Sequence, residues 1–242
     1  MGVPSSLCLS RFRHNSSASL IARDLEGGVR GILSFLVGLG IWAFVSSAAL
    51  AHPHVWVTAR AQLNFDASGK VAGLRHSWTF DEAYSAFQIQ GLGTDGKLPT
   101  REQLAPLAKV NMESLAEFGY FTVLKVDGKQ QDMGTPGNEH LDVGPDKLVT
   151  LTYDLPLKVP VAAKPAMTLQ VYDPEFFVQF DFAPEDAVAL IGAPSGCSNS
   201  SSKPKELEAT DAQRLKDVAG TNESPGTNFG IKLATRVLIA CP

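Results

Sequence analysis

Apolar and polar residues alternate strictly along residues 55–65, with an apolar side chain at every odd position. A period of two is typical of a β-strand with one buried face and one exposed face. Residues 66–69, Asp-Ala-Ser-Gly, have the composition of a turn. The alternation resumes over residues 72–80, with Leu74, His76 and Trp78 on the apolar face. The pattern therefore predicts an antiparallel hairpin.

The register of this hairpin follows from matching the two apolar faces across a four-residue turn. The match places Val57 opposite Trp78 and His54 opposite Asp81, and Glu82 comes next in the chain. We therefore expect a histidine and two carboxylates to lie close together at the open end of the hairpin.

The apolar period then changes from two to that of a helix. Residues 81–90 are predicted to form a short helix, and a longer one follows with a stripe of apolar side chains on one face. The stripe consists of Leu104, Leu107, Ala108, Met112, Leu115 and Phe118. Thr100 and Gln103 form a capping box at its start, and Gly119 ends it. These features predict a helical insertion at about 81–119.

The remainder of the chain is predicted to be mostly strand. The β-type runs are residues 120–126, 148–155, 167–172, 176–182 and 231–241. Short helices are predicted at 184–191 and 205–219, and an exposed serine-rich loop at 195–205. The predicted class is α+β, an antiparallel β-sheet or sandwich with a helical insertion.

The N-terminal region has the features of an export signal. Residues 31–51 carry no charge and end in Ala49 and Ala51, small residues at the positions that signal peptidase requires. We predict that residues 1–51 are a cleaved signal peptide and that residues 52–242 form a single periplasmic domain beginning with His52. An uncleaved membrane anchor is the alternative, because about 20 apolar residues can span a bilayer.

Charge and cysteine usage fit an exported protein. The chain has a net charge of −4, and removal of residues 1–51, with four basic and two acidic residues, changes it to −6. This negative charge argues against nucleic acid or an anionic membrane as a partner. Cys197 and Cys241 remain after cleavage, and an even pair in an exported chain predicts a disulfide. Thiolate metal ligation is the alternative, but no second cysteine lies close to either residue.

The two histidines at the predicted mature N-terminus are candidate metal ligands. His52 and His54 are two residues apart in a strand and so share one face. Imidazole binds Zn, Ni, Co and Cu. With the carboxylates of the hairpin alongside, the predicted site consists of His52, His54, Asp81 and Glu82, and suits Ni, Co or Zn with one open position. The alternative is a polar strand start that binds nothing, with Pro53 tolerated at a sheet edge.

Copper is less expected at this site. An amino-terminal chelate that uses the third residue's histidine needs the amide nitrogen of the second residue as a ligand, and Pro53 has no N–H. A brace made by the terminal amine and imidazole of His52 with a second imidazole remains open.

Three other features have weaker metal interpretations. His76 lies on the apolar face of the hairpin and is predicted to be a hydrogen-bonded core residue. His140 lies in a Gly/Asn-rich loop and is predicted to be exposed. Residues 91–102 resemble a calcium loop with Glu102 at its twelfth position, but Gly91 and Gly93 stand where oxygen ligands belong. We interpret this loop as a turn.

Several motifs together resemble a known family. They are His52-Pro53-His54-Val55-Trp56, Trp78-Thr79-Phe80-Asp81-Glu82, Tyr120-Phe121-Thr122, Val171-Tyr172-Asp173-Pro174 and Cys241-Pro242. The resemblance is to an uncharacterised family of exported bacterial proteins, labelled as a periplasmic component of an ABC-type transport system and associated with nickel/cobalt-type permeases. It covers essentially the whole mature chain and implies a metal-linked periplasmic role.

The sequence thus favours an exported accessory protein that binds Ni, Co or Zn for a membrane metal permease or ABC-type transporter. One alternative is an interaction or structural domain without metal. Another is an oxidative copper enzyme with a histidine brace. No nucleophile triad, phosphate loop or CxxC motif is present, and we expect no enzymatic activity.

Overall fold

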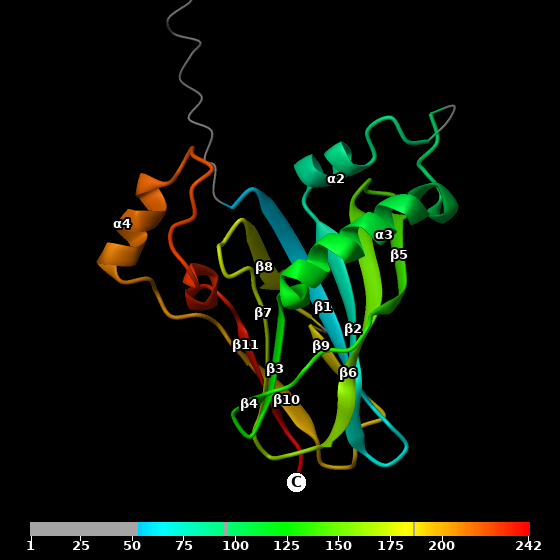
Figure 1. The fold of residues 1–242 in the computed structure, drawn as a ribbon, viewed down its shortest axis with the longest axis vertical. Coiled ribbons are helices and arrows are strands. Elements are labelled where there is room, and N and C mark those ends of the chain that lie inside the picture. The colour runs from blue at the N-terminus through cyan, green and yellow to red at the C-terminus, as the bar shows by residue number, and fades with distance from the viewer. Residues whose placement is uncertain (1–52, 94–95, 186) are drawn as a thin grey trace, which may run out of the picture. The chain divides into compact units, whose positions relative to one another are not determined.

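The computed structural model describes residues 53–93, 96–185 and 187–242, which fall within the unit Ala49–Pro242 (Figure 1). The predicted signal peptide, residues 1–51, and His52 lie outside the described residues. Within the described part, no helix is both long enough and apolar enough to cross a membrane.

The larger of two sheets, sheet A, contains the predicted hairpin. Its strands are β1 (Val55–Phe65), β2 (Lys70–Phe80), β5 (Gly137–Val143), β6 (Val149–Ala162), β8 (Val178–Phe182) and β9 (Val188–Ile191). They are ordered β5-β6-β2-β1-β8, and β9 also pairs with β1. β8 and β9 run parallel to β1, whereas the other pairs are antiparallel.

The second sheet, sheet B, is antiparallel throughout. Its strands, in spatial order, are β10 (Ser198–Ser202), β11 (Arg236–Ala240), β7 (Met167–Val171), β3 (Thr122–Val126) and β4 (Lys129–Gln130). The α-helices are α2 (Glu82–Gln88), α3 (Arg101–Glu117) and α4 (Ala209–Asp217), and 3-10 turns η1 (Gly119–Phe121) and η2 (Phe229–Lys232) lie before β3 and β11.

One face of sheet A is covered along its whole length. At one end, Val57, Ala59 and Trp78 pack with Leu104 and other buried residues of α3. At the other end, apolar residues of the same strands pack against the inner face of sheet B. The polar residues of β1 lie on the opposite, exposed face, as the alternating pattern predicts. Figure 1 shows α3 lying across the strands of sheet A.

The predicted α+β class is confirmed, including the helical segment at 82–117 between the hairpin and the remaining strands. The predicted disulfide between Cys197 and Cys241 is also confirmed. It ties the segment just before β10 to the residue just after β11.

The predicted register of the hairpin is wrong by two residues. Val57 pairs with Phe80 rather than with Trp78, and Ala59 pairs with Trp78. Phe65 pairs with Val71, one residue beyond the predicted register, and an irregularity between Asn64 and Phe65 adds the second residue of the shift. Because the shift is even, the side chains of β1 and those of Leu74, His76 and Trp78 on β2 stay on their predicted faces.

The predicted strands 120–126 and 231–241 begin later than expected, because η1 and η2 occupy their first residues. Three further segments, predicted as helix or loop, are strands. Residues 188–191, predicted as helix, form β9 because they pair in parallel with Ala61–Asn64 of β1. Residues 198–202, predicted as loop, form β10 by pairing with β11. Residues 137–143, the Gly/Asn-rich stretch around His140, form β5 by pairing with β6. In each case a strand partner from elsewhere in the chain decides the conformation.

Candidate functional site at the start of strand β1

Alternate residues just before and at the start of β1 present their side chains to solvent. His54 is exposed, and Trp56, two residues further on, is 46% exposed. Val55 and Val57 alternate with them and face the core. The start of β1 therefore offers one imidazole and one indole on the outer face of sheet A.

Asp81 anchors this strand end to helix α2. One oxygen of its carboxylate accepts a hydrogen bond from the Trp56 N–H at 2.9 Å, and the other accepts from the Tyr84 N–H at 3.0 Å as the helix N-cap. The Asp81 N–H in turn donates to the Trp56 carbonyl at 2.9 Å. Asp81 is therefore opposite Trp56, and the predicted direct pairing of Asp81 with His54 is wrong.

A second carboxylate orders the loop on the other side of His54. Asp173 is 4% exposed and accepts hydrogen bonds from the backbone N–H groups of Glu175, Phe177 and Val178 at 2.9, 2.8 and 3.0 Å. This loop leads into β8, which lies beside β1. Asp173 thus fixes the backbone that carries Phe177.

Phe177 holds His54 in place. The His54 N–H donates to the Phe177 carbonyl at 2.8 Å. The two rings are stacked, with centroids 5.6 Å apart and planes inclined by 18°. The histidine ring therefore has a defined position on the surface even though it is exposed.

The C-terminal part of the chain closes against the same loop. Gly230 donates its N–H to the Pro174 carbonyl at 3.2 Å. A Cβ atom at this glycine would lie 1.8 Å from the Asp173 carbonyl oxygen, so only glycine fits this contact. Phe229 packs on Phe176 beside it, with ring centroids 5.9 Å apart.

Of the four predicted metal ligands, the structure describes three. His54 and Glu82 are exposed, and Asp81 uses both carboxylate oxygens in hydrogen bonds to the backbone. Within residues 53–93, 96–185 and 187–242, no group of three or more His, Cys, Asp or Glu side chains could hold a metal ion. A complete ligand set at this place would need His52, which lies outside the described residues.

His76 is a core residue, as predicted. It is fully buried between the sheets, and its Nε2 lies 3.2 Å from the Thr122 hydroxyl. Burial lowers the pKa of His76 to about 3. Tyr153, its partner on β6, is equally buried, and burial raises the pKa of that phenol well above its ordinary value, only partly offset by the nearby Thr122 hydroxyl. These groups are uncharged at neutral pH.

The last residues of the loop at 91–102 cap the N-terminus of helix α3. The Thr100 hydroxyl accepts from the Gln103 N–H at 3.4 Å, and the Gln103 side chain accepts from the Thr100 N–H at 2.9 Å, which confirms the predicted capping box. Two positions of the proposed calcium loop, 94 and 95, lie outside the described residues.

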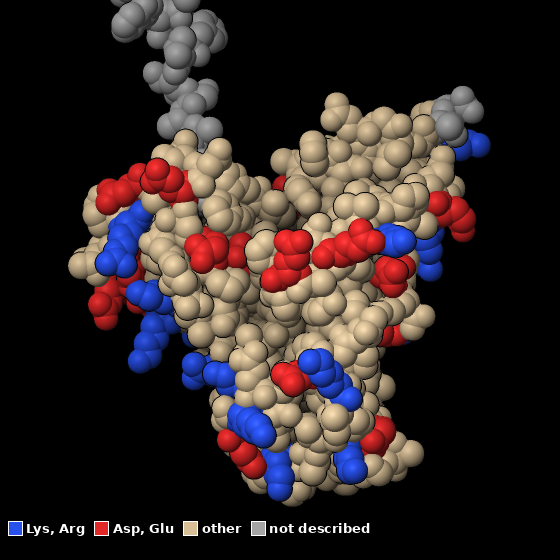
Figure 2. All heavy atoms as spheres, viewed as in Figure 1, with Lys and Arg blue, Asp and Glu red and all other residues tan. Residues whose placement is uncertain are grey.

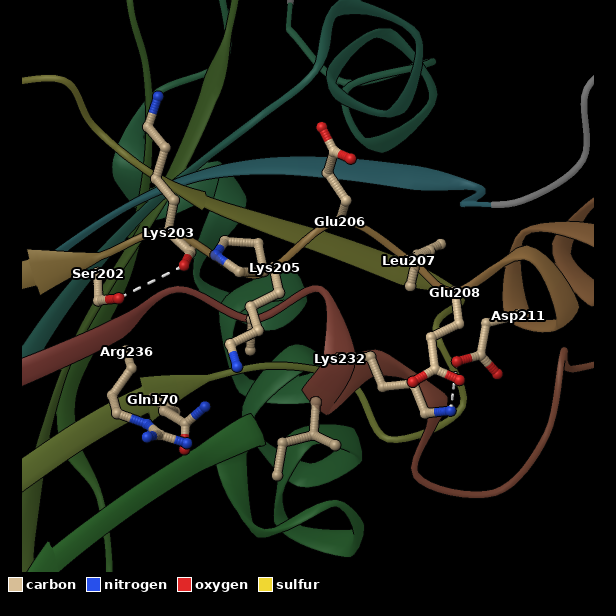
Figure 3. A pocket seen from close by; sticks show the side chains of 13 residues that line it. Gln170, Ser202, Lys203, Lys205, Glu206, Leu207, Glu208, Asp211, Lys232 and Arg236 are labelled. Carbon is tan, nitrogen blue, oxygen red and sulfur yellow. Dashed lines mark hydrogen bonds and ion pairs between the residues drawn. The ribbon is translucent and has the colours of Figure 1, made fainter.

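Sequence reasoning missed two pockets. One, of about 440 Å³, lies beside α4 and η2 and contains both signs of charge (Figure 3). Lys205 and Arg236 lie on one side of it, and on the other Lys232 forms an ion pair with Asp211 at 2.6 Å. Glu206 and Glu208 add further negative charge to its rim. The charges nearly cancel, so this pocket does not select a ligand of one sign.

The second pocket, of about 220 Å³, lies under α3 against the inner face of β1, β2 and β8. Its walls include Val55 and Val57, the inward neighbours of His54 and Trp56. It could not be found from the sequence because it depends on how α3 sits on the sheet.

Acidic and basic side chains are interspersed over the face of the molecule shown in Figure 2.

Comparison with known proteins identifies relatives. Residues 37–241 match the family described as "Protein of unknown function (DUF1007)". The chain is also 25% identical over 211 residues to an "Uncharacterized protein" from Haemophilus influenzae, an alignment that covers 86% of this chain and 98% of that protein. Because the family match spans most of its length, the chain belongs to the DUF1007 family.

Proposed function

We propose that this protein is an exported periplasmic accessory protein that binds a divalent transition metal, Ni, Co or Zn, at the start of β1 and serves a membrane metal permease or ABC-type transporter. The observation that carries the proposal is the exposed His54 imidazole, held by Phe177 and by a loop built on Asp173. An ordered imidazole loses little freedom when it binds a metal.

We propose that His52 and Glu82 supply further ligands beside this imidazole. His52 precedes His54 by two residues in the sequence, a spacing that would put both imidazoles on one face of a strand. Glu82, the first residue of α2, is exposed and adjacent to Asp81. Asp81 binds backbone amides with both oxygens, and we assign it mainly to positioning β1 against α2, with its remaining lone pairs open to a metal.

Other properties support export and a cationic ligand. The disulfide between Cys197 and Cys241 suits an oxidising compartment. The net charge of −6 after removal of residues 1–51 favours a cation over an anion. The transporter partner rests on the family resemblance of the motifs around His54, Asp81 and Asp173.

Calorimetric titration with Ni²⁺, Co²⁺ and Zn²⁺ tests the proposal on protein purified from cells that export it, with its N-terminus determined by mass spectrometry. We expect one site, lost in His54→Ala and retained in His140→Ala. His140 is the matched control because its Nδ1 contacts the Asn138 carbonyl on β5, far along the sheet order from β1. Absence of binding at micromolar metal concentrations would contradict the proposal.

A second titration distinguishes the proposed site from the copper alternative. A variant whose cleavage leaves one extra residue before His52 keeps both imidazoles but moves the terminal amine. Retained Ni, Co or Zn binding supports the accessory site. Copper binding that is lost only in this extended form would instead indicate a histidine brace.

An interaction domain without metal is the second candidate function. It is favoured by large apolar side chains exposed on and beside α2 and α3, such as Phe87 at 70% and Phe118 at 53% exposure. Co-purification of the exported protein with a membrane protein that survives His54→Ala and is lost in Phe87→Ser would support it.

A further inference from the structure

The outer face of sheet B is hollowed beside α4 and η2. Leu169 of β7 and Val237 of β11 point into the core, so the residues next to them in each strand, Gln170 and Arg236, face outward. Both line the pocket of about 440 Å³. The segment between β10 and α4, the start of α4 and η2 complete its walls.

Gln170 places a nearly buried amide in this pocket. The residue is 6% exposed although it lies on the outer face, because the other walls of the pocket cover it. Its side-chain amide forms no hydrogen bond within the part of the chain that the structure describes, and it keeps contact with solvent, unlike the sealed, unpaired polar atoms of His76, Trp78 and Tyr153. A molecule in the pocket can therefore reach this amide, and a hydrogen bond to it recovers free energy.

Two basic side chains accompany Gln170. Lys205 and Arg236 are exposed, and neither forms an ion pair or a side-chain hydrogen bond with another described residue. In Figure 3, Lys205 extends toward the side of the pocket that holds Arg236 and Gln170. An ammonium, a guanidinium and an amide N–H together suit a carboxylate, which the guanidinium can hold with two parallel hydrogen bonds.

The opposite side of the pocket carries negative charge. Glu208 and Asp211 are three residues apart at the start of α4 and so share one face of the helix. Asp211 is 7% exposed and pairs with Lys232 through one oxygen, whereas Glu208 forms neither a side-chain cap hydrogen bond nor an ion pair with a described residue. Two carboxylates thus lie beside one ammonium, and the positive end of the α4 dipole adds only about half an elementary charge. This side therefore favours a cationic group.

The pocket also has an apolar wall and room for a molecule larger than one amino acid. Leu207, Ile231 and Ala234 line it, and Ile231 is 39% exposed, so its apolar surface is open to an occupant. The volume is about three times that of a cavity of about 150 Å³, which holds benzene, and it exceeds the roughly 300 Å³ at which pockets for drug-sized ligands start. Two or three amino-acid residues fit this space.

We propose that this pocket binds a short peptide with free termini and apolar side chains. The C-terminal carboxylate takes the side of Gln170, Lys205 and Arg236, and the N-terminal ammonium takes the side of Glu208. A single amino acid carries both charges on one carbon, whereas these protein groups lie on opposite sides of the pocket, so a peptide of two or three residues matches them (Figure 3). The site is separate from the metal site proposed above, because it lies on the outer face of sheet B and not at the start of β1.

Four probes test the proposal by calorimetric titration of the exported protein: the tripeptide Ala-Leu-Ala, its N-acetyl form, its C-terminal amide, and free leucine. Acetylation removes the positive end and amidation removes the negative end, and neither changes the side chains. We expect Ala-Leu-Ala to bind below millimolar concentration and each blocked form to bind roughly tenfold more weakly. Leucine, which reaches only one side of the pocket, should also bind more weakly than Ala-Leu-Ala.

Two variants assign the ends, and each is judged against a peptide that it should not affect. Arg236→Gln should weaken Ala-Leu-Ala roughly tenfold and leave binding of the amide form unchanged. Glu208→Gln should weaken Ala-Leu-Ala and leave binding of the N-acetyl form unchanged. The unaffected peptide shows in each case that the pocket is still folded. Lys216→Gln is the control, because Lys216 is an exposed residue of α4 that does not line the pocket, and it should bind as the wild type does.

Four results would overturn the proposal. Failure of Ala-Leu-Ala to bind at millimolar concentration would remove the site. Equal binding of the three tripeptides would mean that the pocket does not recognise charged ends. A loss on blocking only one end would indicate a ligand with a single charge. Leucine that binds as tightly as Ala-Leu-Ala would indicate an amino acid in place of a peptide.

Discussion

The Nε2 atom of His76 lies 3.2 Å from the Thr122 hydroxyl, and this contact joins the two sheets, because His76 is on β2 and Thr122 is on β3. Both residues are buried. The Thr122 hydroxyl also lies 2.7 Å from the Tyr120 carbonyl, which can only accept. The hydroxyl therefore donates to Tyr120 and accepts from His76, so the neutral imidazole carries its hydrogen on Nε2.

Replacement of Thr122 by valine should destabilise the fold. The valine keeps the shape of the side chain but leaves the Nε2–H of His76 buried without an acceptor, at a cost of about 1–3 kcal/mol. Urea unfolding at neutral pH measures the loss. Thr122→Ser is the control, because it keeps the hydroxyl and loses one methyl group, worth about 1 kcal/mol. Equal stability of Thr122→Val and wild type would mean that the contact contributes nothing.

The free energy of unfolding should fall as the pH drops below about 6.5. Burial lowers the pKa of His76 to about 3 in the folded protein. The unfolded chain, with an ordinary histidine, therefore binds more protons than the folded chain between these two values. The contribution of the neutral His76 to the free energy of unfolding is fully present above about pH 6.5. It is lost by up to about 1.4 kcal/mol per pH unit as the pH falls toward about 3.

Urea unfolding between neutral pH and about pH 5 isolates this effect, since most carboxylates titrate at lower pH. His76→Gln should flatten the dependence over that range. His54→Gln, at an exposed histidine, should leave it steep. A wild-type protein whose stability is constant down to about pH 5 would contradict the buried neutral state of His76.

Asp173→Asn should loosen the loop that positions His54. The asparagine offers one acceptor oxygen where the carboxylate accepts three backbone N–H groups, and hydrogen bonds to a charged acceptor are the stronger ones. We expect a loss of about 1–3 kcal/mol and a change in the His54 ring signals in NMR spectra. Asp146→Asn, in an exposed turn where one N–H is accepted, should cost less than about 0.5 kcal/mol.

Asp81 and Glu82 are adjacent carboxylates with different expected roles. Asp81→Ala removes the N-cap of α2 and the acceptor of the Trp56 N–H, so we expect a loss of about 1–2 kcal/mol in unfolding experiments. Glu82→Ala, at an exposed site, should be nearly neutral for stability. If Glu82 is a ligand, the Glu82→Ala substitution should instead weaken metal binding in the titration described above. Equal stability losses in both variants would argue against this division.

The sequence predicted the strand face of each side chain better than it predicted which residues pair between strands. The period of two correctly assigned every side chain of β1 to its face, although the pairing of Val57 was wrong. A shift of two residues leaves each side chain on the same face of its strand. The alternation therefore cannot distinguish two registers that differ by two residues. The irregularity after Asn64 that adds to the shift leaves no mark in the composition of the turn.

Strands that depend on distant partners were the main failures. Residues 188–191 follow a proline and resemble a short helix, but β1 offers them a parallel partner. Gly137 and Asn138 resemble a loop, and Asn138 indeed has a φ of 56° at the irregular start of β5. The pocket under α3 was equally hidden, because it depends on the distance between this helix and the sheet.

The disulfide was predictable from the even pair of cysteines that remains after the predicted export signal is removed, and its energetic role can be measured. It closes a loop with a sequence separation of 44 residues that contains β10, α4, η2 and β11. In the chain-entropy description such a loop is worth about 4 kcal/mol. Cys197→Ala/Cys241→Ala should lower the free energy of unfolding by about this amount, and wild-type protein in dithiothreitol should match the double variant. A much smaller loss would mean that the unfolded loop is already restricted, by residual structure around the sulfur atoms, and that the covalent bond adds little to it.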